Sequence, residues 1–282
     1  MRSLKVIERY IGFLLSAPKE EEELETYREI EEGVVFRGYN LWILGFAMIL
    51  ACIGLITNSI TAVIGAMLMS PLMGPVAGFA FAVAINDRDL KIKSIKNWLL
   101  MTAVSLLAAT LFFVISPFHK TTELLEVYDH ASIFDIMVAF FGGMAGFIGV
   151  MKKEGTKIIA GVAIATACMP PLCTAAYGIA NGEIYHFLGG FYFYLINSMF
   201  IGWATFLLAR YFKFNSVRQE RKNSFYQIAW DILIVVIMIP GIYIAYQKWN
   251  AQEGKQQPPT DQQRIELLEK KVNDLEKQLH KN

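Results

Sequence analysis

The sequence predicts an all-α polytopic membrane protein with about seven transmembrane helices. Hydrophobic residues make up 55% of the 282 residues and charged residues only 18%, and the charges lie between long apolar runs. Two of these runs contain prolines near their middle, which an unbroken spanning helix does not accommodate. A chain of this kind is expected to fold in a lipid bilayer. Its net charge of +1 argues against a nucleic-acid partner.

Residues 1–38 are expected to form two helices on the cytoplasmic side. Met1–Ser16 has apolar residues at helical spacing, but charges interrupt them. That pattern is typical of an interfacial amphipathic helix rather than of a cleaved signal peptide. After Pro18 a helix is expected with glutamates in its first turn, where they suit the positive end of the helix dipole. A solvated face is the main interpretation of these glutamates, and a cation site is the alternative.

The transmembrane domain is expected between residues 39 and 249. Its seven apolar segments are 39–57, 59–85, 98–116, 133–151, 156–180, 185–211 and 225–249. Lysine and arginine gather in every second connection, at 86–97, 152–157 and 210–222. Because basic connections remain in the cytoplasm, we expect a cytoplasmic N-terminus and a C-terminus outside.

Prolines interrupt the second and the fifth of these segments. Pro71 and Pro75 lie in the second, and Pro170 and Pro171 lie in the fifth. Proline donates no amide hydrogen, and its ring crowds the carbonyl four residues back. Polar backbone groups are therefore freed at membrane depth, where lipid offers them no hydrogen bond.

The two interrupted segments also resemble each other. Residues 64–80 align without a gap on residues 164–180, which pairs Pro71 with Pro171 at a distance of 100 positions. If residues 39–116 and 133–211 each cross three times, the second copy runs through the membrane in the opposite sense. The sequence therefore predicts two inverted three-helix repeats with proline-broken helices and a seventh helix, the plan of many secondary transporters.

Candidate solute-binding residues are the neutral polar residues near the breaks together with the prolines. They are Asn58, Ser59, Ser70, Pro71, Pro75, Thr166, Pro170, Pro171, Thr174, Asn197 and Ser198. Their oxygens beside freed carbonyls suit a desolvated cation such as sodium, and the helix starts after the breaks suit an anionic group. The alternative is local: Ser and Thr bond back to their own helix, and Asn58 with Ser59 forms a turn.

An enzyme, a cofactor and a metal site are not expected. The sequence has no Walker loop, no Ser-His-Asp set and no intramembrane pair of acids. Its three cysteines, Cys52, Cys168 and Cys173, lie in apolar runs and are interpreted as small core residues. His186 begins a segment, and the two loop histidines at 119 and 130 are too far apart to make a good metal site.

The C-terminal tail is expected to form a short coiled coil. Residues 250–263 are a polar linker, and residues 264–282 carry apolar positions alternately three and four apart. These positions are Ile265, Leu268, Val272, Leu275 and Leu279. The pattern favours a parallel pair, and so predicts a homo-oligomer that the membrane part also holds. The alternative is one amphipathic helix lying on lipid or on its own protein.

Two motifs resemble a known family. Ile64-Gly-Ala-Met-Leu with Pro71-Leu-Met-Gly-Pro75, and Gly161-Val-Ala-Ile-Ala with Met169-Pro-Pro-Leu172, are similar to the prokaryotic family known as domain of unknown function 389. The similarity covers about residues 41–212. It implies a multi-pass protein of the prokaryotic inner membrane and brings no settled substrate or reaction.

Architecture favours a transport protein. The leading hypothesis is a secondary transporter or channel for a small solute or ion, which binds near the midplane at the broken helices. The alternative is a non-transporting membrane scaffold or envelope sensor that acts through its coiled-coil tail, with broken helices that are tightly packed and dry. A membrane enzyme acting on lipid ranks third, because acid and base residues are scarce.

Overall fold

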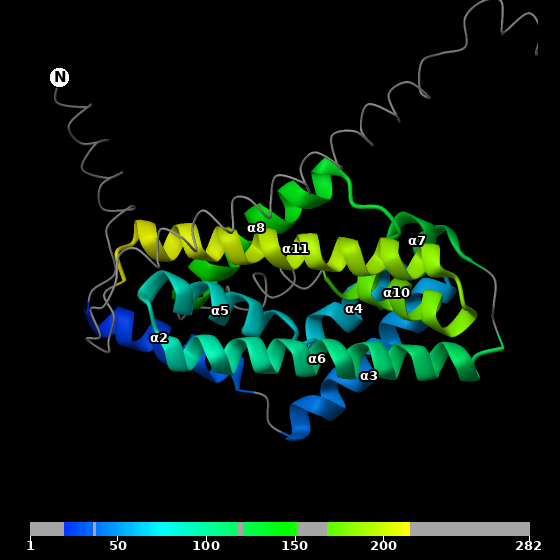
Figure 1. The fold of residues 1–282 in the computed structure, drawn as a ribbon, viewed down its shortest axis with the longest axis horizontal. Helices are drawn as coiled ribbons and strands as arrows, with labels where there is room; N and C mark the ends of the chain where they lie inside the picture. The colour runs from blue at the N-terminus through cyan, green and yellow to red at the C-terminus, as the bar shows by residue number, and fades with distance from the viewer. Residues whose placement is uncertain (1–19, 36–37, 118–120, 152–167, 215–282) are drawn as a thin grey trace, which may run out of the picture. The chain divides into compact units, whose positions relative to one another are not determined.

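The computed structural model describes residues 20–35, 38–117, 121–151 and 168–214, and within these ranges every regular element is a helix (Figure 1). Four helices are long and apolar enough to cross a membrane: α3 (Gly38–Ile56), α6 (Arg88–Ile115), α8 (Ile133–Met151) and α11 (Ile184–Tyr211). A fifth candidate span is bent by 53° between α4 (Ile60–Met69) and α5 (Met73–Ile85). The described helices therefore agree with a multi-pass membrane protein. The seventh segment and the coiled-coil tail lie outside these residues.

The third predicted span begins earlier than its apolar segment. Helix α6 starts at Arg88, so residues 88–97 are helical and the prediction of a basic loop there is wrong. Asp87 explains this start, because its side chain accepts a hydrogen bond from the Leu90 amide at 3.0 Å and so caps the helix. The basic residues of the predicted loop thus lie on the first turns of α6.

Prolines stand at helix starts in both halves. Helix α10 (Met169–Asn181) has Pro170 and Pro171 in its first turn, where their missing amide hydrogens would have had no helical acceptor. Pro75 is the third residue of α5, and Pro171 is the third residue of α10. In helix position Pro171 therefore matches Pro75, 96 residues earlier (171 − 75), and not Pro71 as the ungapped alignment has it.

Corresponding helices have equal lengths in the two halves. Both α5 and α10 have 13 residues, α6 and α11 have 28, and α3 and α8 have 19. In Figure 1, α5 and α10 lie between α6 and α11, toward opposite ends of these two long helices. Each short helix accordingly contacts both long ones.

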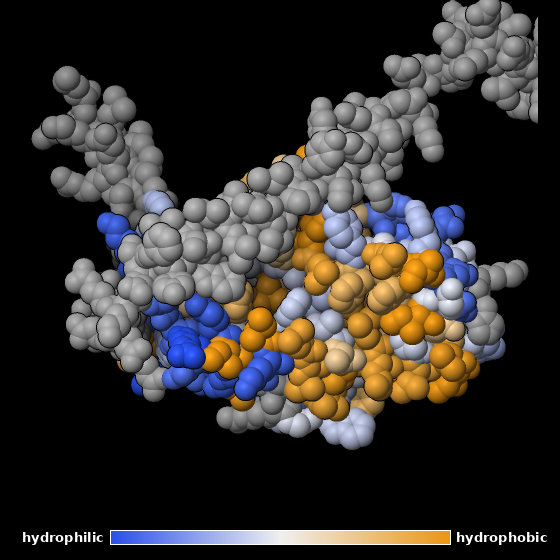
Figure 2. All heavy atoms as spheres, viewed as in Figure 1, coloured by the Kyte–Doolittle hydropathy of each residue, from blue (hydrophilic) through white to orange (hydrophobic). Residues whose placement is uncertain are grey.

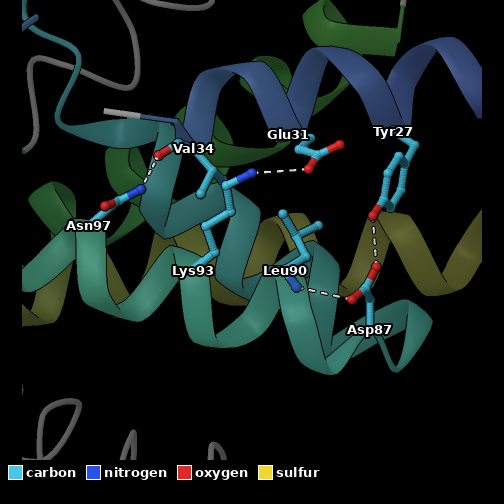
Figure 3. Close-up of polar contacts among 7 residues, drawn as sticks. All are labelled: Tyr27, Glu31, Val34, Asp87, Leu90, Lys93 and Asn97. Atoms are coloured by element: carbon cyan, nitrogen blue, oxygen red, sulfur yellow. Dashed lines mark hydrogen bonds and ion pairs between the residues drawn. The ribbon is translucent and has the colours of Figure 1, made fainter. Parts of the chain in front are cut away.

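Helix α2 (Glu20–Val34) packs against α5, α6 and α8. Figure 3 shows the polar contacts: the Tyr27 hydroxyl donates to Asp87 at 2.7 Å, Lys93 to Glu31 at 3.0 Å, and the Asn97 amide to the Val34 carbonyl at 2.7 Å. Val34 itself is fully buried. The end of α2 is therefore part of the helix bundle.

Apolar and polar side chains separate on the surface. Figure 2 shows hydrophobic residues over much of α6 and over the uncovered part of α11, and hydrophilic residues over the beginning of α6 and around α7 (Glu123–Val127). Large side chains such as Leu107, Leu111 and Ile115 of α6 are exposed. An apolar belt with polar ends is the surface that a bilayer requires.

Candidate functional site

An aromatic pair joins the two long helices. The rings of Trp98 on α6 and Tyr194 on α11 are stacked, with centroids 6.2 Å apart and planes 12° apart. Thr102 lies one turn from Trp98 and donates its hydroxyl hydrogen to the Trp98 carbonyl at 2.8 Å. Since that hydrogen is used, the Tyr194 hydroxyl is the donor in the 2.7 Å bond to Thr102. This contact fixes α6 against α11 with a buried polar group.

A cavity of about 340 Å³ lies next to this pair, between α5, α6 and α11. Its walls are largely apolar and include four aromatic side chains, and Ser198 adds a hydroxyl. The aromatic residues are Phe79, Trp98, Trp203 and Phe206. The described residues that line the cavity include no charged side chain. A bare ion would lose its hydration there without compensation, whereas an uncharged, largely apolar molecule would not.

Ser198 connects the cavity to the beginning of α10. Its Oγ lies 3.5 Å from the Sγ of Cys168, the residue that precedes the first turn of α10. Nearby, Thr174 and Ser105 are fully buried, and their hydroxyls have no hydrogen-bond partner among the described residues. A buried hydroxyl without a hydrogen-bond partner costs about 1–3 kcal/mol. The hydroxyls of Thr174 and Ser105 therefore keep an unused capacity for hydrogen bonding near α10.

Asn58 and Ser59, both predicted at the site, lie in the turn between α3 and α4 and do not line the cavity. Asn58 has a φ of 52°, and its side chain accepts a hydrogen bond from the Leu124 amide at 3.2 Å. Ser59 caps α4 by accepting from the Ala62 amide at 3.4 Å. These contacts match the local alternative, in which the two residues shape a turn.

The remaining predicted residues divide between the break and the core. Ser70 follows the last turn of α4, and its hydroxyl accepts from the Leu72 amide at 3.4 Å, with Pro71 between them. Pro170, Pro171, Thr174 and Asn197 are buried in α10 and α11. Pro75 and Ser198 are the two predicted residues that line the cavity, and Thr166 lies outside the described residues.

Sequence reasoning missed Trp98, Thr102 and Tyr194. One signal could have found them: Trp98 and Tyr194 are 96 residues apart (194 − 98), as are Thr102 and Ser198 (198 − 102). This is the same interval that separates the starts of α5 and α10. Within the described ranges, no cluster of three His, Cys, Asp or Glu side chains is suited to a metal ion.

Comparison with known proteins bears on the middle of the chain. Residues 67–203 match the model of a family described as domain of unknown function (DUF389). An uncharacterized protein of Methanocaldococcus jannaschii is 24% identical over 214 residues, which cover 72% of this chain and 65% of that protein, less than two thirds of its length. No solved structure matches the chain. The resemblance drawn from the two proline motifs is thus confirmed, since residues 67–203 match the model of that family.

Proposed function

We propose that this chain is a membrane transport protein, either a secondary transporter or a channel, for a small solute that binds between α5, α6 and α11. One observation carries the proposal: a helix that begins at prolines borders a cavity in the helix bundle, where Pro75 and Ser198 share a wall. A helix start and a hydroxyl beside a cavity are features that broken helices supply in secondary transporters.

Agreement between the halves supports an inverted repeat. The short helices α5 and α10 have equal lengths, and each contacts the long helix of the other half. In a repeat with a two-fold axis, residues near the axis meet their own counterparts. Trp98 and Tyr194, which correspond at the interval of 96 residues, stack on each other. Rocking of one half against the other would then alter the cavity that lies beside this pair.

The cavity walls indicate the class of solute. Aromatic side chains and one hydroxyl favour an uncharged molecule with a largely apolar surface and one hydrogen-bonding group. The sequence favoured a cation such as sodium, but the described residues that line the cavity include no charged side chain to bind one. The solute would be held by ring contacts and oriented by Ser198.

The basic residues of α6 indicate how the site is oriented in the membrane. The beginning of α6 carries Arg88, Lys91 and Lys93, which favours the cytoplasmic side of a prokaryotic inner membrane for this end. The proposal retains a cytoplasmic N-terminus, an external C-terminus and a homo-oligomer joined by residues 264–282. That tail lies outside the described residues.

Filling the cavity tests the proposal. A Cβ on Gly202 would stand 3.7 Å from Ala80 and 3.8 Å from Val76, so a methyl group fits and a leucine side chain would occupy the cavity. Gly45 of α3 has nothing within 4 Å of its own Cβ position, and it lines a separate apolar groove of about 660 Å³ between α3 and α6. Gly202→Leu and Gly45→Leu are therefore matched substitutions in two spanning helices.

Both variants would be purified and reconstituted into liposomes loaded with a panel of small uncharged solutes and ions. We expect protein-dependent flux of at least one solute, its loss in Gly202→Leu and its retention in Gly45→Leu. Absence of flux for every panel member would leave the scaffold as the better explanation. Loss in Gly45→Leu with retention in Gly202→Leu would move the site to the groove between α3 and α6.

Thiol labelling gives a second test in the unmodified chain. Cys168 is buried beside Ser198, whereas Cys52 is buried within the unbroken helix α3, where its thiol contacts Cys173 of α10. If water enters at the cavity, a small membrane-impermeant thiol reagent should modify Cys168 and spare Cys52. Equal resistance of both thiols in all conditions would favour a dry scaffold.

A further inference from the structure

A histidine lies between two carboxylates at the end of the bundle that carries α7. His186 is the third residue of α11. Its Nδ1 lies 2.6 Å from an oxygen of Asp129, and its Nε2 lies 3.0 Å from an oxygen of Glu183. The exposed fractions of the side chains are 12% for His186, 3% for Asp129 and 44% for Glu183. A buried acid, a nearly buried imidazole and a half-exposed acid thus form one row.

The three side chains need one more proton than a neutral histidine and two ionised acids carry together. Neutral imidazole has one N–H and one lone pair, so one of its nitrogens would face a carboxylate oxygen with no hydrogen between them. Both contacts become attractive when the imidazole is protonated. Histidine is the side chain that ordinarily changes charge between about pH 5 and 8.

Asp129 depends on the positive charge of protonated His186 more than Glu183 does. Its Oδ1 has no hydrogen-bond partner among the described residues, and the contact of Oδ2 with His186 is an ion pair without hydrogen-bond alignment. A buried carboxylate that loses its counter-charge is strongly destabilised, whereas Glu183 can turn to water. Loss of the proton from His186 therefore acts on the segment that holds Asp129.

Packing brings that segment against α11. A Cβ on Gly189 would overlap the Asp129 carbonyl oxygen, so the glycine allows the two backbones to touch. Tyr177 of α10 places its ring edge-on to His186, with centroids 5.6 Å apart. This contact joins the row to α10, the helix whose first turn contains Pro170 and Pro171.

Neighbouring titratable groups do not replace His186. His130 is hydrogen-bonded to Tyr185, whose ring also contacts His186. Burial, and then the charge of Asp135, raises the pKa of Tyr128, so that phenol stays neutral in this range. The groups that face His186 are therefore the two acids and the rings of Tyr177 and Tyr185.

We propose that Asp129, His186 and Glu183 form a proton-binding site, and that the bound proton holds the segment from α7 to Asp129 against α11. The segment is docked at low pH, when the imidazole is charged, and is released as pH rises. This site does not depend on transport. Its ligand is the proton itself, and its effect is a local change of structure that can be measured without a substrate.

The test uses a spin label on α7. Val127 is exposed, so a label on Val127→Cys reports the mobility of the segment. The full-length chain, with its three native cysteines replaced, would be placed in nanodiscs and its spectrum recorded between pH 5 and 9. We expect one transition from an immobile to a mobile label as pH rises. A label that is equally mobile throughout this range would overturn the proposal.

Three variants assign the transition. His186→Gln should abolish it, and His130→Gln, the matched control next to Asp129, should leave it intact. Glu183→Gln removes the half-exposed acid without disturbing the core, so it should move the midpoint to lower pH because the charged imidazole loses one partner. Persistence of an unchanged transition in His186→Gln, or its loss in His130→Gln, would show that another group binds the proton.

Discussion

The two halves of the bundle share helix lengths but differ in how their short helices are surrounded. Residues 38–115 and 133–211 each contain a 13-residue helix that begins at prolines and a 28-residue helix that follows it. Along α10 the first ten residues are all buried, whereas α5 borders the cavity and also contacts α2. Prolines and lengths therefore define the framework, and the side chains between helices decide where a cavity remains.

Small residues exchange places between the halves. In the first half Gly78 of α5 faces Ser94 of α6, and in the second Thr174 of α10 corresponds to Gly78 while Gly190 of α11 corresponds to Ser94. A Cβ on Gly190 would overlap backbone atoms of Pro171 and Ala175. In the second half the backbone of α11 at Gly190 thus packs directly on the backbone of α10, with no side chain between them. This explains the close packing of α10.

The largest expected effect comes from making the second half like the first. Gly190→Ser adds a side chain where the backbone of α10 leaves no space, and we expect a loss of about 3 kcal/mol in the free energy of unfolding. Gly65→Ser on α4 is the control, since nothing lies within 4 Å of its Cβ position. Thermal unfolding in detergent, followed by circular dichroism, compares the two. Equal stability would mean that α10 is not packed as tightly as described.

A second prediction compares the starts of the long helices. Asp87 caps α6 and also accepts the Tyr27 hydroxyl, whereas Glu183 precedes α11 without a capping hydrogen bond. Asp87→Ala should therefore cost about 2 kcal/mol, one part from the cap and one from the buried contact with α2. Glu183→Ala should change unfolding much less, because the side chain of Glu183 makes no capping hydrogen bond. A larger loss for Glu183→Ala would reverse the comparison.

The third prediction concerns the contact on which the halves meet. Tyr194→Phe keeps the ring stacked on Trp98 but removes the hydroxyl that donates to Thr102. We expect a loss of about 1 kcal/mol, the net contribution of a single buried hydrogen bond. A double-mutant cycle with Thr102→Val isolates the coupling between the two side chains. Additive effects would show that the bond does not connect α6 and α11.

Apolar runs and prolines predicted the described spans and a helix start near each proline break, because burial in lipid and a missing amide hydrogen act locally. The register of the proposed repeat was less predictable, since the ungapped alignment paired Pro71 with Pro171, whereas position within the helix pairs Pro75 with Pro171. Asn58 was selected as a polar residue near a break, yet its left-handed backbone places it in a turn. Trp98 and Asp129 were missed, because their partners lie far along the chain and meet them only after helix packing.

The smallest expected effect concerns α2, which packs against α5 of the first half. Lys93 and Glu31 form an ion pair whose side chains are 41% and 43% exposed, so solvent screens it, and Lys93→Gln should cost at most about 0.5 kcal/mol. Val34 is fully buried against Gly78, so Val34→Ala should loosen α2 more. Limited proteolysis within α2 at low and high salt measures both. Release of α2 by Lys93→Gln, or by salt alone, would show that charge rather than packing holds this helix and sets the first half apart.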